Sequence, residues 1–103
     1  MKIRWSDHAV SDLQSARDLI ARDSDHYAAH YIEGILDAVE RLETFPKLGR
    51  RVPEEPNDPN LRELIHRNHR IMYRLQGEAI NIVTVVDARS DLEGVDPKPW
   101  EVG

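Results

Sequence analysis

Apolar residues recur with a helical period in the first half of the chain and with a strand period in the second half. Residues 2–5 alternate between polar and apolar side chains, and apolar positions then return every three to four residues over 9–20 and again over 28–42. This spacing gathers them on one face of each helix. Ser6 or Asp7 can cap the first helix, and the sequence DSD at 23–25 can cap the second. We therefore predict a short strand followed by an αα-hairpin.

Three strand-like segments follow a long loop in the second half. Residues 46–60 hold four of the six prolines and show little periodicity, so we predict a surface loop there. Strands are predicted over 61–65, 70–75 and 79–86, with short links between them. The order βααβββ gives an α+β fold, in which a small antiparallel sheet is packed on one face by the N-terminal αα-hairpin.

Strand alternation divides the hairpin of 70–75 and 79–86 into two faces. If an even number of residues links the strands, one face is almost wholly apolar, and it consists of Ile71, Tyr73, Leu75, Ile80, Ile82, Thr84 and Val86. The opposite face is half apolar and half charged, with Arg70, Met72, Arg74, Asn81, Val83, Val85, Asp87 and Arg89. We expect the helices to cover the first face and to leave the second one open.

The mixed second face has two interpretations. It suits a docking surface for another protein chain, because such surfaces combine apolar area with charged residues. Alternatively, the arginine stems cover the exposed side of a thin sheet while their charged ends reach water. Under the first interpretation, the predicted binding residues are Arg70, Met72, Arg74, Asn81, Asp87 and Arg89.

Size and composition restrict the class of protein. The 103 residues, 40% hydrophobic and 32% charged, suit a single globular domain, which we place at 1–92. The tail at 93–103 either wraps the surface or stays mobile. No apolar run approaches the ~18 residues of a membrane span, residues 1–10 lack the apolar centre of a signal peptide, and there is no cysteine, so we expect a cytoplasmic protein that binds no membrane.

The charge distribution argues against general nucleic-acid binding. The net charge is −5, whereas phosphate binding depends mainly on lysine and arginine. From Lys47 to Arg74, however, seven basic residues stand against four acidic ones, a balance of +3, which leaves −8 for the rest of the chain. A locally basic middle is thus set in an acidic body.

Motifs for metal binding and catalysis are weak or missing. His66 and His69 flank a tight turn, and His26 and His30 are spaced as on one helix face, but a zinc site needs three or four ligands. Tyr73 could be proposed as a general acid, although its apolar strand phase favours core packing. We find no phosphate loop and no nucleophile elbow, and we expect no metal, no cofactor and no enzymatic activity.

Five motifs follow one another along nearly the whole chain: IRWSDHAVSDL, LETFPKLGRRVP, LRELI, HRIMYRL and INIVTVVDARSDLE. In this order and spacing the chain resembles the ParE branch of the ParE/RelE toxin superfamily. The resemblance implies the toxin of a type II toxin–antitoxin system, neutralised by a cognate antitoxin whose C-terminal segment wraps the toxin as helix and extended strand. ParE-type members are described as poisons of DNA gyrase, whereas RelE-type members cut mRNA in the ribosomal A site.

The resemblance also separates the two branches. RelE-type cleavage implies a cluster of cations that stabilises the phosphorane charge, with a C-terminal tyrosine nearby. Arg70 falls at the shared arginine, but Leu61 and Glu63 occupy the lysine positions, and Ser90 or Asp91 falls at the later arginine. No tyrosine follows Tyr73. We therefore expect a toxin that binds its target without cleaving RNA.

Two alternatives stay open at the level of the sequence. One is a RelE-like ribosome-dependent mRNA endonuclease that uses Arg70 and Arg74. The other is a degenerate toxin that acts only as an antitoxin-binding module. The last strand departs from the usual ParE pattern of a histidine–glycine pair followed by two arginines, since it reads DARS at 87–90.

Overall fold

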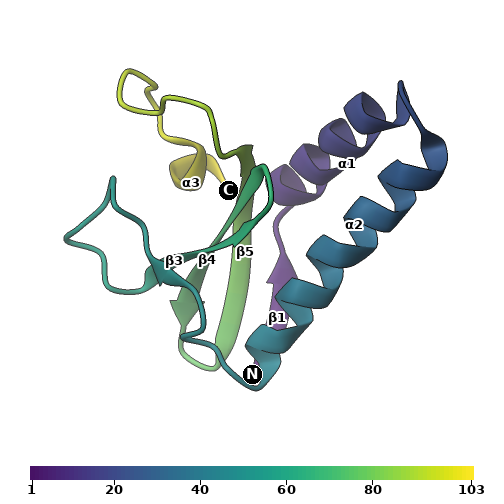
Figure 1. Ribbon diagram of the computed structural model, residues 1–103. Helices are drawn as coiled ribbons and strands as arrows, with labels where there is room; N and C mark the ends of the chain where they lie inside the picture. Colours follow the sequence, from purple (N-terminus) through teal and green to yellow (C-terminus); the bar gives the residue numbers. More distant parts are fainter.

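The helices and strands follow the predicted order, with a 3₁₀ turn added at the end of the second helix and two further short elements elsewhere. The computed structural model describes all residues from 1 to 103. Its elements are β1 (Lys2–Trp5), α1 (Asp7–Ala21), α2 (Asp25–Glu40), the 3₁₀ helix η1 (Arg41–Glu43), β2 (Arg50–Arg51), β3 (Leu61–His66), β4 (His69–Gln76), β5 (Ala79–Asp87) and α3 (Pro99–Val102). The predicted α+β class is confirmed (Figure 1). β2 and α3 were not predicted, because two or four residues are too few to show a period.

The five strands form one sheet in the order β1-β5-β4-β3-β2. Neighbouring strands are antiparallel except at one edge, where β1 runs parallel to β5, so the sheet is mixed. The link between β4 and β5 has two residues, which confirms the even number that the apolar pattern required. Gly77 has φ +58° at the first position of this turn, a conformation that tight hairpin turns reserve for glycine.

The helices begin where the sequence placed their caps. Ser6 Oγ accepts a hydrogen bond from Ala9 N, and Ser24 Oγ accepts one from Tyr27 N, both at 3.0 Å. Figure 1 shows α1 and α2 side by side on one face of the sheet. Their apolar stripes and the facing strands form a core of ten buried residues: Ala9, Tyr31, Ile35, Val39, Leu42, Ile71, Tyr73, Ile80, Ile82 and Val85.

A β-bulge in β5 changes the predicted alternation. Tyr73 pairs with Ile82, but Met72 pairs with Thr84, so Val83 is an extra residue in β5. The predicted alternation of Ile82, Thr84 and Val86 on the helix-covered face is therefore wrong beyond Ile82, because Val85 enters that core and Val86 packs against the cluster on the opposite face. Asp12 of α1 binds next to the bulge, where its Oδ2 accepts hydrogen bonds from Thr84 Oγ1 at 2.6 Å and Val85 N at 3.0 Å.

The second face of the sheet is covered too, although the sequence predicted it to be open. Residues from the 46–60 loop, the strands and the tail bury a second apolar cluster of six: Val52, Leu61, Met72, Val83, Leu92 and Trp100. The indole Nε1 of Trp100 donates to Glu55 Oε1 at 3.3 Å, and Lys98 Nζ donates to the backbone oxygen of Glu93 at 2.8 Å. Figure 1 shows this loop and the C-terminal residues on the side of the sheet opposite to the helices.

None of the helices has the length and apolar character that crossing a membrane requires.

Candidate protein-binding surface

Arg70 lies in β4 beneath the loop and the tail, where both edges of its guanidinium group are occupied. Its Nε donates to Glu63 Oε1 at 2.6 Å, and its two Nη atoms donate to the Glu54 carboxylate at 2.8 and 2.7 Å. Only 6% of the residue is exposed. The bonds to Glu54, and then the bond to Glu63, raise the pKa of Arg70 above its ordinary value, and the hydrogen bonding of Arg70 lowers the pKa of Glu54.

Glu63 completes this network from β3. Its side chain is fully buried, and its second oxygen accepts from Arg50 Nε at 2.7 Å. Two arginines and two glutamates therefore neutralise one another, with Arg70 and Glu63 buried and Arg50 and Glu54 reaching solvent. A cation held in this way is not free to stabilise charge that develops on a substrate.

Arg74 and Asn81 lie opposite each other on β4 and β5. Both are half-buried, and each has a partner within the chain: Arg74 Nη2 donates to Asp58 Oδ2 at 3.3 Å, and Asn81 Nδ2 donates to Gln76 Oε1. Because the ion pair of Arg74 is partly solvated, it holds the arginine only weakly. These two side chains can still be reached by a partner.

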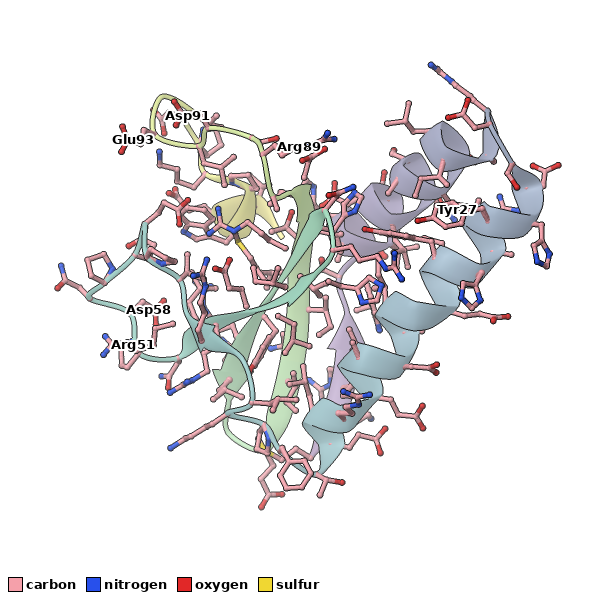
Figure 2. All side chains as sticks on the ribbon, in the orientation of Figure 1. Tyr27, Arg51, Asp58, Arg89, Asp91 and Glu93 are labelled. Atoms are coloured by element: carbon pink, nitrogen blue, oxygen red, sulfur yellow. The ribbon has the colours of Figure 1, made fainter.

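Asp87 and Arg89 form a pair at the far end of β5. Arg89 Nε and Nη2 donate to the Asp87 carboxylate at 3.0 and 2.8 Å, and these bonds hold the pKa of Asp87 well below its usual value. Arg89 is exposed. In Figure 2, Arg89 lies near the tail residues Asp91 and Glu93, whereas Asp58, the partner of Arg74, lies in the loop on another side of the sheet.

The predicted binding residues thus do not form one open patch. Arg70 and Met72 are buried, so the expectation that they lie on an uncovered face is wrong, and Arg74 and Arg89 lie at different places. The physical reason is that the loop and tail carry apolar anchors, Val52, Leu92 and Trp100, which close the face. A role in partner binding stays a prediction for Arg74, Asn81, Asp87 and Arg89.

The two histidines of the β3–β4 turn meet a tyrosine of α2. The Tyr31 hydroxyl lies 2.7 Å from His69 Nδ1 and donates to the His66 backbone oxygen at 3.2 Å. Burial lowers the pKa values of both histidines and raises that of Tyr31. No group of three or more His, Asp or Glu side chains in the structure could hold a metal ion. The cluster fastens the hairpin to α2.

Tyr73 lies in the helix-side core, in agreement with its strand phase. The side chain is fully buried, its hydroxyl donates to the Pro46 backbone oxygen at 2.8 Å, and it accepts from Gly49 N at 2.9 Å. Burial raises the pKa of this phenol, which makes its proton harder to release. These contacts fasten the start of the 46–60 loop.

A groove that the sequence reasoning did not identify lies between β1 and the end of α2. Its lining consists of Ile3, Trp5, Leu36, Val39, Glu40 and Glu43. Leu36 is 44% exposed, which is unusual for a leucine on a helix that packs on a sheet. The only signal in the sequence is that Leu36 falls beside the buried stripe of α2 rather than on it.

Comparisons with known proteins bear on the fold and the family. Residues 3–92 match the family model described as the ParE toxin of the type II toxin–antitoxin system, parDE. Among solved structures, the chain is similar to one titled "Chromosomal ParDE TA system from P. aeruginosa", with 21% identity and a TM-score of 0.72 over 86% of this chain and 97% of that one. At this identity, the structural match shows a shared fold. No curated protein matches the chain significantly.

Proposed function

Because the chain belongs to the ParE toxin family of type II toxin–antitoxin systems, as its motifs predicted, we propose that a cognate antitoxin neutralises it and that the free toxin inhibits DNA gyrase. Inhibition takes place in the bacterial cytoplasm, through binding and without a catalytic step. One observation favours this proposal over RNA cleavage: the guanidinium group of Arg70 is fully paired with Glu63 and Glu54.

Cleavage of RNA needs positive charge that is available to the phosphate in the transition state. At this position the arginine is buried and neutralised, and Glu63 places a buried negative charge next to it. Arg74 is nearer to solvent, but it faces Asp58. A polyanion would meet paired charges here, which supports a toxin that recognises a protein surface.

Expression of the chain alone from an inducible promoter in a bacterial host tests the proposal. We expect growth arrest, induction of the SOS response and an accumulation of trapped gyrase–DNA cleavage complexes, because a bound poison stops gyrase after it has cut DNA. Co-expression with the product of the adjacent small reading frame is expected to restore growth. Purified chain should inhibit supercoiling by gyrase in the same concentration range in which it binds the enzyme.

Primer extension on translated mRNA from the same cultures provides the control. Cuts within codons, without an SOS response, would show a ribosome-dependent nuclease. Normal growth together with tight binding of the adjacent gene product would show a degenerate toxin. Normal growth without any binding contradicts the proposed function altogether.

A further inference from the structure

The cover of the second sheet face stops short of the turn between β4 and β5. The apolar cluster on this face includes Met72 and Val83 of the two strands. Closer to the turn, two adjoining clefts remain open, and they share Arg4 and Gln76 in their linings. In Figure 1, α3 lies beside the upper part of the sheet, away from this turn. The end of the face next to the turn is thus accessible to another molecule.

Two unpaired cations of β1 project into this accessible region. Lys2 and Arg4 alternate along the strand with Ile3 and Trp5, which pack against the helix-side core. Because successive side chains of a strand point to opposite faces, Lys2 and Arg4 lie on the face that the helices do not cover. Both are exposed, and neither forms an ion pair.

Arg74 extends the row of cations to β4. Asn81 of β5 is paired in register with Arg4 on one side and with Arg74 on the other. Neighbouring strands lie ~4.8 Å apart, so the backbones of the two arginines are about 10 Å from each other. Arg74 is held by a single, partly solvated ion pair with Asp58. Such a pair is weak, so Arg74 can turn toward an incoming anion.

Two amide side chains add hydrogen-bond donors between the cations. Asn81 Nδ2 donates to Gln76 Oε1. Since each amide nitrogen has two hydrogens, one N–H of Asn81 and the NH₂ group of Gln76 are left to donate to a ligand. We call the five residues that supply these cations and amides the cationic patch: Lys2, Arg4, Arg74, Gln76 and Asn81.

The cationic patch is positive although the chain as a whole is negative. In the two clefts, three cations stand against one acid, Glu78, a balance of +2. The helical hairpin over 7–43 contains nine acidic and three basic residues, a balance of −6 out of the net −5, so the rest of the chain carries +1. The hairpin lies on the other side of the sheet (Figure 1). Salt screens exposed charges beyond about 8 Å, so the hairpin does little to repel an anion from the patch.

The composition of the patch favours phosphate groups over a protein surface as its ligand. Of the ten large apolar residues that are exposed, only Met1 lines these clefts. Protein interfaces are centred on apolar and aromatic anchors, whereas contacts to the DNA backbone come from Arg, Lys, Asn and Gln side chains. Lys2 and Arg4 are about 7 Å apart along the strand, which lets them contact separate phosphates of one DNA backbone.

We propose that the cationic patch binds the phosphate backbone of the DNA that gyrase holds, while other surfaces of the chain bind the enzyme. Lys2 and Arg4 each contact a phosphate group, Arg74 leaves Asp58 to contact a third one, and the amides of Gln76 and Asn81 donate to phosphate oxygens. The contact does not depend on base sequence, because the backbone is the same for every sequence. The inference rests on the proposed function, since it assigns a second component of the same target.

Fluorescence anisotropy of a short labelled DNA duplex, titrated with the purified chain, tests the patch directly. For three phosphate contacts we expect log affinity to fall with log salt concentration at a slope of about −2.7, a loss of about 40-fold between about 50 and 200 mM salt. The double variant Lys2→Gln and Arg4→Gln should bind at least about tenfold more weakly, and its slope should shrink to about −0.9.

The matched control is the double variant Arg22→Gln and Arg67→Gln. It removes the same charge at two exposed positions that form no ion pair, one at the end of α1 and one in the β3–β4 turn, which lies at the opposite end of the sheet from the patch. Its affinity for the duplex should stay within about twofold of the wild type. Circular dichroism verifies that both double variants are folded.

Binding to gyrase with and without DNA connects the patch to the target. We expect the wild type to bind the gyrase–DNA complex at least about fivefold more tightly than gyrase alone, because the complex adds phosphate contacts. The Lys2→Gln and Arg4→Gln variant should bind gyrase alone as the wild type does and should lose most of the gain from DNA. The control variant should keep that gain.

The outcomes separate this inference from the proposed function. If the wild type does not bind the duplex at low salt, if both double variants lose affinity equally, or if DNA does not strengthen binding to gyrase, the inference fails and gyrase inhibition stands. If polyglutamate displaces the duplex at an equal concentration of charge, the ligand is an acidic protein and the inference is wrong. If gyrase is not bound at all and growth is unaffected, both proposals fail together.

Discussion

The sheet face beneath α1 and α2 buries ten apolar residues supplied by regular elements, whereas the opposite face buries six whose cover comes from a loop and a tail. The second face also contains the ion-pair network of Arg70, Glu63, Arg50 and Glu54. An amphipathic helix can cover a sheet face because its apolar residues recur along one side, whereas a loop has no such stripe and needs individual apolar side chains to anchor it. The difference indicates that the first face depends mainly on packing and the second on a few individual contacts.

The largest effect should come from removing the centre of the buried network. Glu63→Ala leaves Arg70 buried with part of its charge unpaired, so we expect a loss of about 4 kcal/mol in the free energy of unfolding, measured by urea titration. The exposed Asp87–Arg89 pair serves as a control, and Asp87→Ala should leave stability nearly unchanged.

A double variant sharpens this result. Glu63→Leu with Arg70→Met replaces the buried charges by apolar groups of similar size, so most of the lost stability should return. If Glu63→Ala costs no more than Asp87→Ala does, the network is not what closes the second face.

The anchor of the tail should have the next largest effect. Trp100→Ala removes a side chain that is 98% buried, and the expected loss is about 3 kcal/mol, because a large aromatic residue leaves a cavity or exposes its neighbours. We expect this loss to be local. Hydrogen exchange should rise over the tail and over Met72 and Val83, while amides in α1 and α2 stay protected. Equal loss of protection on both faces would contradict the division into two regions.

A single carboxylate ties the helix-covered face together at the bulge of β5. Asp12→Ala removes the acceptor of Thr84 Oγ1 and Val85 N, and we expect a loss of about 2 kcal/mol, because hydrogen bonds to a charged acceptor are among the stronger ones. Asp18→Ala, which lies on the exposed side of the same helix, is the matched control. Similar unfolding midpoints for the two variants would show that the bulge is supported by packing alone.

The sequence predicted the helix-covered face well because the apolar residues that form it recur with the regular periods of helices and strands. The stripes of α1 and α2, the two cap regions and the strand phase up to Ile82 were correct, and the structure selects Ser6 over Asp7 and Ser24 within DSD as the capping residues. The bulge at Val83 was not predicted, because Ile, Val and Thr all suit a strand and nothing in the local sequence marks an extra residue. The burial of the second face was not predicted, because Val52, Leu92 and Trp100 are isolated apolar residues among prolines and charged residues and show no period. Glu63 could be read only as a departure from a lysine, not as the partner of Arg70, because strand pairing was needed to bring them together.

The smallest expected effect concerns pH and the contact between α2 and the β3–β4 turn. Burial lowers the pKa values of His66 and His69, while Asp87 opposes and Arg89 supports the shift at His69. Each neutral ring therefore contributes stability that is fully present above the unfolded value of about 6.5 and is lost as pH falls below it. Unfolding midpoints measured from pH 7.5 to 5.5 should decline in the wild type and decline less in the variant with His66→Gln and His69→Gln. His30→Gln, at an exposed position of α2, should keep the wild-type slope. Equal declines of the unfolding midpoint with pH for all three proteins would show that the two histidines titrate alike in the folded and unfolded chain. The contact between α2 and the β3–β4 turn would then not respond to pH.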